Sequence, residues 1–169
     1  MYDSDDAALE ALGARFLTAV DAIQGGRVDD AEEELRAILR VEPRLPEPRL
    51  ELARLLLDTE RLEEAEAQAR EGVADLQKSG PWTDELDADT VMAIGKALLA
   101  EILRRRADED DVIFGDAGRF KAIVAESQAL FAEAAKLDPS DEYASYHAFF
   151  LGAKGHGGAE PGELDLDEN

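Results

Sequence analysis

Apolar residues recur at three- and four-residue steps along most of the chain, and this spacing predicts a series of amphipathic helices. The first runs from about residue 7 to 24. Its apolar positions are Leu9, Leu12, Phe16, Val20 and Ile23. A second helix is predicted at about residues 29–41, a third from Pro46 onward and a fourth at 62–76. A fifth ends at about Arg106, and a later one contains Phe131. Strand-like runs of Val, Ile and Thr are missing, so we expect an all-α protein.

Glycine and proline mark where the predicted helices begin and end. Gly25-Gly26 follows the first helix, and glycine is the usual residue just past a helix end. Pro43 stops the second helix, whereas Pro46 and Pro48 fit the first turn of the third, where a missing N–H costs little. A longer break, Ser79-Gly80-Pro81-Trp82-Thr83, precedes the fifth helix.

A segment near the start of the chain is echoed 34 positions later. Gly26-Arg27-Val28-Asp29-Asp30-Ala31 corresponds to Glu60-Arg61-Leu62-Glu63-Glu64-Ala65, and each copy opens an amphipathic helix. A period of this length is typical of helix-turn-helix repeats, which bury their apolar faces only by stacking on one another.

The spacing resembles the tetratricopeptide repeat, whose units place small and apolar residues at fixed positions. Matching positions in the first two units are Ala19, Ala31, Leu35, Ile38 and Pro43, then Leu52, Ala53, Leu56, Ala65 and Ala69. A third set matches across an insertion: Ile94, Gly95, Leu98, Phe131, Ala134 and Pro139. Gln77 stands where the second unit should close with proline. The resemblance implies a short right-handed α-solenoid of about three helical hairpins with a C-terminal capping helix.

We therefore predict one helical domain over residues 7–153, between a flexible acidic start (1–6) and a disordered acidic tail (153–169). The predicted units are 12–45, 46–78 and 86–139. The third carries an insertion at about 104–120, and a capping helix is expected at 141–152.

In this family the first helix of each unit lines a concave groove that holds another protein. Carried over to this chain, the groove residues are Phe16, Val20, Ile23, Leu50, Arg54, Leu57, Met92, Lys96 and Leu99. The implied partner is a peptide or amphipathic helix, with a basic face that would suit the acidic chain. Helical apolar stripes are core by default, so the alternative is that several of these side chains are simply buried. The Lys and Asn residues that clamp a terminal carboxylate in chaperone-tail-binding relatives are replaced here, so that role is rejected.

Three further residues are candidate secondary contacts. Trp82 is expected to plug the junction between the second and third units; if exposed, it would be a binding hot spot. Ile113 and Phe114 belong to an apolar run inside an acidic loop. We expect this run to fold back between the long helices, because soluble proteins hide large apolar clusters, with an exposed anchor as the alternative.

Charge and composition exclude other kinds of function. The formal charge of −22 disfavours binding to nucleic acid, and no apolar run approaches the length of a membrane span. There is no cysteine, and the two histidines, His147 and His156, have no metal-like partners at helical spacing. We therefore expect no catalytic residue, cofactor or metal, and a cytoplasmic protein.

The sequence thus predicts a non-catalytic adaptor, scaffold or chaperone that binds a segment of another protein. Two alternatives stay open: a structural protein that self-associates as a homodimer through apolar helix faces, and a secretion-type chaperone for a client protein.

Overall fold

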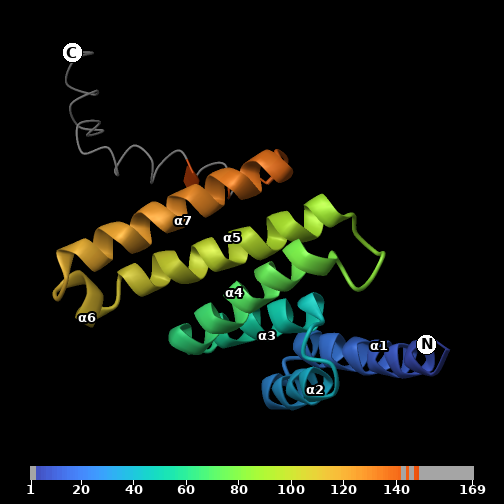
Figure 1. Ribbon diagram of the computed structural model, residues 1–169. Coiled ribbons are helices and arrows are strands. Elements are labelled where there is room, and N and C mark those ends of the chain that lie inside the picture. Colours follow the sequence, from blue (N-terminus) through green and yellow to red (C-terminus); the bar gives the residue numbers. More distant parts are fainter. Residues whose placement is uncertain (1–2, 142–143, 145–146, 149–169) are drawn as a thin grey trace. The chain divides into compact units, whose positions relative to one another are not determined.

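The computed structural model of the chain describes residues 3–141, 144, 147 and 148. These residues contain seven α-helices and no β-strand, which confirms the predicted all-α fold (Figure 1). The chain divides into two compact units, Met1–Thr83 and Asp84–Asn169, where the sequence predicted one domain. The division falls at the end of the Ser79–Thr83 break, the longest interruption of the helical pattern.

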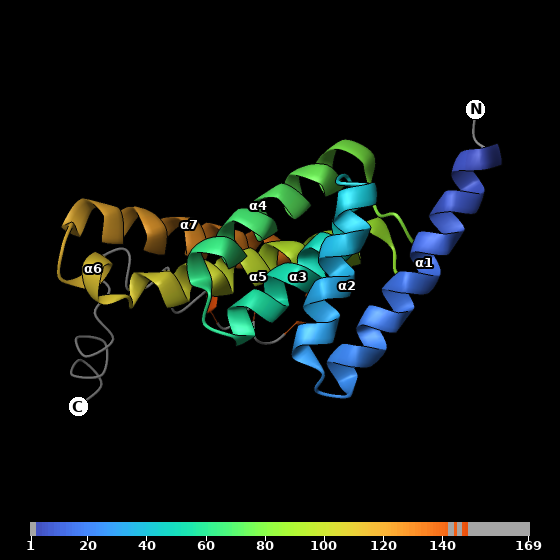
Figure 2. The same cartoon turned by 90° about the horizontal axis from the view of Figure 1, so that it is seen from below.

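The first unit consists of two helical hairpins. Its helices are α1 (Asp3–Gln24), α2 (Val28–Val41), α3 (Pro46–Asp58) and α4 (Leu62–Ser79). α1 packs on α2, α3 packs on α4, and α2 also contacts α3, so the two hairpins stack through their inner helices (Figure 2). These hairpins are the first two predicted units.

The first helix begins earlier than expected. α1 starts at Asp3 rather than at about Ala7, so the helix extends into the acidic start of the chain. An acidic segment is favoured in the first turn of a helix, because its negative charge complements the positive end of the helix dipole.

The segments that repeat after 34 residues also share their backbone conformation. Gly26 and Glu60 both adopt a left-handed φ, at 75° and 64°. In both turns the next residue donates its N–H to the carbonyl five positions earlier: Arg27 to Ala22 at 2.8 Å and Arg61 to Leu56 at 2.9 Å. The same turn therefore closes the first helix of each unit.

The core of the first unit is built from small and branched residues at the repeat positions. Ala31, Leu35, Ile38, Ala53, Leu56 and Ala65 are fully buried. α3 is buried on most sides, because α2 and α4 cover it from two directions. Gly72 of α4 lets that helix approach closely, since a Cβ there would lie 2.9 Å from Leu50 Cδ2.

The second unit contains one long helical hairpin. α5 (Ala88–Ala107) and α7 (Ala117–Leu137) run side by side, and the short α6 (Asp110–Ile113) joins them at one end (Figure 1). Phe131 and Ala134 of α7 are fully buried against Ala100 of α5. The Ser127 hydroxyl donates a hydrogen bond to the Ala100 carbonyl at 2.7 Å, which satisfies this buried polar side chain.

Part of the predicted capping helix lies within the described residues. Ala144, His147 and Ala148 are helical, and Ala144 and Ala148 pack on the same cluster as Phe131. The remainder of the expected capping helix and the acidic tail 153–169 lie outside the described residues. His156 lies there too.

Candidate functional site

The predicted groove residues of the first helix form a partly open apolar surface. Phe16, Val20 and Ile23 on α1 are all half-buried. Leu17, beside them on the same helix, is 59% exposed and is not among the predicted groove residues. Arg54 projects from the exposed side of α3. The first unit therefore displays apolar side chains on α1 and one cation on α3.

Three of the predicted groove residues are core residues instead. Leu50, Leu57 and Leu99 are buried, and Leu50 lies against Gly72 of α4. The assignment fails because α3 and α5 are apolar on several sides. An apolar stripe does not by itself distinguish the side that packs on a neighbouring helix from the side that faces a partner.

Lys96 is held by a contact inside the second unit. Its Nζ donates a hydrogen bond to Glu133 Oε2 at 3.1 Å, which joins α5 to α7. Met92, one turn earlier on α5, is half-buried. The two cations predicted for the groove therefore differ: Arg54 is exposed, whereas Lys96 is largely covered and paired.

Trp82, which was predicted to plug the junction between the second and third units, packs on the first hairpin. Its ring centroid is 5.8 Å from that of Phe16, with the two planes tilted by 50°. Both rings pack against the cluster of Leu12, Ile38 and Leu45. The indole also lies 4.0 Å from the position that a Cβ on Gly13 would occupy. The segment after α4 thus returns to cover part of α1.

Glu47, in the first turn of α3, fixes the backbone of this returning segment. Its Oε1 accepts the Trp82 N–H at 2.9 Å, and its Oε2 accepts the Thr83 N–H at 2.7 Å and the Thr83 hydroxyl at 2.9 Å. Hydrogen bonds to a carboxylate are about twice as strong as neutral ones. One side chain therefore holds two consecutive residues against the first unit.

The return of the chain depends on the glycine that ends α4. Gly80 has φ 73° and ψ −176°, a conformation that residues with a Cβ rarely adopt. The sequence shows Gly80-Pro81 as a break, but it does not show where the break leads. Glu47 lies 35 positions before Trp82 and belongs to no motif, so no local signal linked them.

The acidic tip of the second unit, formed by α6 and the residues that follow it, has both buried and exposed apolar side chains. Val112 is fully buried, whereas Ile113 is 46% exposed and Phe114 is 82% exposed. The expectation that the apolar run folds back is right for Val112 and wrong for Ile113 and Phe114. α6 is a single turn of helix, so consecutive side chains point in different directions and only one of the three faces the long helices.

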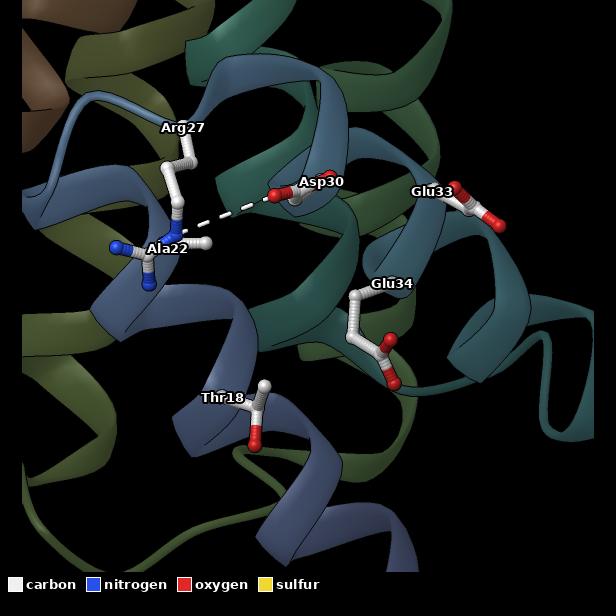
Figure 3. Close-up of a pocket in the computed structure, with 6 residues that line it drawn as sticks. All are labelled: Thr18, Ala22, Arg27, Asp30, Glu33 and Glu34. Carbon is white, nitrogen blue, oxygen red and sulfur yellow. Dashed lines mark ion pairs between the residues drawn. The ribbon is translucent and has the colours of Figure 1, made fainter.

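A depression of about 320 Å³ lies between α1 and α2 (Figure 3). Thr18 and Ala22 line it from α1, and Asp30, Glu33 and Glu34 from α2. Arg27 lies 4.0 Å from Asp30, and both side chains are mostly exposed. The walls are polar, solvated and mostly of one charge, which does not match the apolar lining of a typical small-molecule pocket.

The histidine that lies within the described residues has a packing role. His147 stacks on Phe131 with ring centroids 5.0 Å apart, and burial lowers its pKa. Across the described residues, no group of three His, Cys, Asp or Glu side chains is placed to hold a metal ion. In the same part of the chain, none of the helices has the length and apolar composition needed to cross a bilayer.

Comparison with known proteins identifies the repeat. Residues 22–82 match a family model described as a tetratricopeptide repeat. This segment runs from the end of α1 to Trp82, so it contains the second and third helices, the fourth, and the returning segment. No curated protein matches the chain. Residues 22–82 therefore resemble a tetratricopeptide repeat, and the match covers a little over a third of the chain.

Proposed function

We propose that the first unit binds a segment of another protein across the exposed faces of α1 and α3, and that the protein is a non-catalytic adaptor, scaffold or chaperone. Tetratricopeptide repeats are protein-interaction modules, which supports the general class. The observation that carries the proposal is the set of apolar side chains left open on α1, namely Phe16, Leu17, Val20 and Ile23, together with the exposed Arg54 on α3. An amphipathic helix or an extended segment fits such a surface.

The test compares two substitutions of the same kind at different places on the unit. Val20→Asp puts a charge on the proposed surface. Val41→Asp makes the same change at the end of α2, where Val41 is already 62% exposed. Wild-type and variant proteins are used as bait in a native lysate after a check of helicity and mass. We expect a protein retained by wild type and Val41→Asp to be lost with Val20→Asp.

The opposite patterns reject the surface. Equal retention by all three baits places the contact elsewhere, and equal loss with Val41→Asp shows only a nonspecific effect of added charge. Arg54→Glu then tests the cation: a partner with an acidic or carbonyl-rich segment loses affinity, whereas one with a basic face gains it. A dimeric mass of wild type with no retained protein favours the self-associating alternative.

Phe114 and Ile113 form a second proposed contact. Their exposure at the end of a one-turn helix, among Asp110, Asp111 and Asp116, suits a partner with an apolar pocket and a basic rim. Phe114→Ser is the matching variant in the same retention assay. Loss with Phe114→Ser and not with Val20→Asp would place the principal contact on the second unit.

A further inference from the structure

The segment Pro81-Trp82-Thr83 occupies part of the surface proposed for partner binding. The Trp82 ring lies against Phe16 and over Gly13 of α1, and Glu47 of α3 holds the backbone that follows. α1 and α3 are the first helices of their units. The segment thus contacts the two helices that would line the groove.

The contacts use features that many peptides share. They consist of one aromatic ring, two consecutive backbone N–H groups and one hydroxyl, received by an apolar patch and one carboxylate. Nothing in this set depends on the segment being covalently attached to α4. A segment of another protein with an aromatic residue followed by Thr or Ser can make the same contacts.

We infer that this patch, formed by Leu9, Leu12, Gly13, Phe16 and Glu47, is a recognition site for an extended aromatic-Thr or aromatic-Ser segment, which the chain's own Trp82-Thr83 occupies in competition with the partner. The inference rests on the proposed function and names the chemistry of the segment bound there. With a chain charge of −22, the favoured competitor is neutral or basic around its aromatic residue.

Two features make displacement of the internal segment feasible. Trp82 is only half-buried, and residues 84–89, which follow it, are exposed, so releasing the segment uncovers little further surface. Leu17 and Val20 lie on the same side of α1 and offer apolar contacts for the rest of a partner segment. A tethered segment acts at an effective concentration of the order of millimolar, so it weakens but does not prevent partner binding.

The experiment exploits the fact that Trp82 is the one tryptophan of the chain. The Trp82→Ala variant of the full chain removes the internal ring and opens the apolar part of the patch, whereas the donors of residues 82 and 83 to Glu47 remain. The probe is a fluorescein-labelled, amidated Ser-Gly-Pro-Trp-Thr peptide, followed by fluorescence anisotropy. We expect it to bind Trp82→Ala at least about tenfold more tightly than wild type, because the tethered ring no longer competes.

A matched pair of variants tests the carboxylate. Glu47→Gln, added to Trp82→Ala, replaces one acceptor oxygen with a donor that faces an N–H group, and affinity for the peptide should fall about tenfold. Glu33→Gln makes the same charge change on an exposed part of α2 and should leave affinity unchanged. An equal loss of peptide affinity in both variants would mean that long-range charge causes the effect, and the proposed recognition site would be overturned.

Two further results would overturn the inference. One is a Trp82→Ala chain of native helicity that does not bind the peptide at millimolar concentration. The other is equal affinity in Trp82→Ala and wild type. If Trp82→Ala does not fold, Glu47→Gln in the wild-type background decides: we expect a red-shifted Trp82 emission and stronger acrylamide quenching at unchanged helicity. Unchanged emission and quenching would show that Glu47 does not hold the segment.

Failure here is distinguishable from failure of the proposed function. If Val20→Asp abolishes partner binding but the peptide does not bind, the proposed binding surface stands and the aromatic-Thr or aromatic-Ser ligand is rejected. A chain that binds the peptide but retains its partner equally with Val20→Asp has the recognition site and binds that partner elsewhere.

Discussion

Glu32 on α2 and Arg61, the residue before α4, form a two-bond ion pair between consecutive repeat units. Arg61 Nη1 donates to Glu32 Oε2 at 3.0 Å, and Nη2 donates to Oε1. Arg36 extends the network: its Nε donates to Glu32 at 2.9 Å and its Nη2 to Glu64 of α4 at 2.8 Å. These ion pairs thus join the second helices of both units.

The lowered pKa of Glu32 should make the protein less stable in acid. The hydrogen bond from Arg61, assisted by Arg36 and opposed by desolvation, lowers the pKa of Glu32 from 4.5 to about 2. Between these values the unfolded chain binds more protons than the folded one, so the free energy of unfolding falls as the pH decreases. Arg61 is partly solvated, so we expect about 1 kcal/mol at neutral pH.

The variant Glu32→Gln isolates this contribution. Urea unfolding followed by circular dichroism should show wild type about 1 kcal/mol more stable at neutral pH, with the difference narrowing below about pH 5. Glu33→Gln, on an exposed part of the same helix, should stay within about 0.5 kcal/mol of wild type at every pH. A constant difference for Glu32→Gln across the range would show that ionisation of Glu32 is not responsible.

Arg27 and Arg61 occupy the same position in the two units and should differ in energetic importance. Arg61 makes the two-bond pair with Glu32 of the preceding unit, whereas Arg27 lies 4.0 Å from the exposed Asp30. We expect Arg61→Ala to cost about 1 kcal/mol and Arg27→Ala less than about 0.5 kcal/mol. Urea midpoints of the two variants provide the measurement, and equal midpoints would contradict an inter-repeat role for this position.

The regular part of this fold could be predicted from the sequence because its signal is periodic. Ala31 and Ala65 lie 34 positions apart and both are fully buried, so the period alone placed two hairpins in register. Proline and glycine near the ends of these helices then placed most boundaries within three residues of those observed. A closely packed position requires a small residue at that point of the chain, so its place can be predicted from the sequence.

The candidate site could not be predicted to the same extent because its contacts are not local. The pair Glu47 and Trp82 depends on the path of the chain after Gly80, which no pattern of apolar residues specifies. Leu50 and Leu57 were misplaced for a different reason. An amphipathic pattern shows which residues avoid water, but it does not show whether the chain itself or a partner covers them.

The buried Arg49 should be a major contributor to the stability of the first unit. It donates hydrogen bonds to the Pro43 carbonyl at 2.7 Å and to Gln68 Oε1 of α4, and it lies 4.0 Å from Asp75. Burial raises the pKa of Asp75, and Arg49 opposes that shift. Arg49→Met keeps most of the side-chain volume but removes the donors to Pro43 and Gln68 and the positive charge near Asp75. We expect a loss of about 2–3 kcal/mol in urea unfolding.

Arg49→Lys serves as the charge-conserving control. A lysine keeps the positive charge near Asp75, but its single ammonium group cannot reproduce the planar fork that reaches Pro43 and Gln68 together. We expect a loss smaller than that of Arg49→Met and still measurable. If both variants matched wild type, the buried guanidinium of Arg49 would be energetically neutral.

Truncating the small side chain of Val112 should destabilise the second unit more than truncating the large side chain of Phe114. Val112→Ala removes two methyl groups from a fully buried site, and we expect it to cost about 1–2 kcal/mol. Phe114→Ala removes an entire ring from a side chain that is 82% exposed, and should change stability by less than about 0.5 kcal/mol. Because the chain divides into two compact units, amide hydrogen exchange of α5 and α7, which reports on the second unit by itself, is the appropriate measurement. Faster exchange in Phe114→Ala than in Val112→Ala would show that the ring stabilises the hairpin. Unchanged exchange would show that folding does not require an exposed aromatic residue at this tip, as expected of a side chain retained for binding.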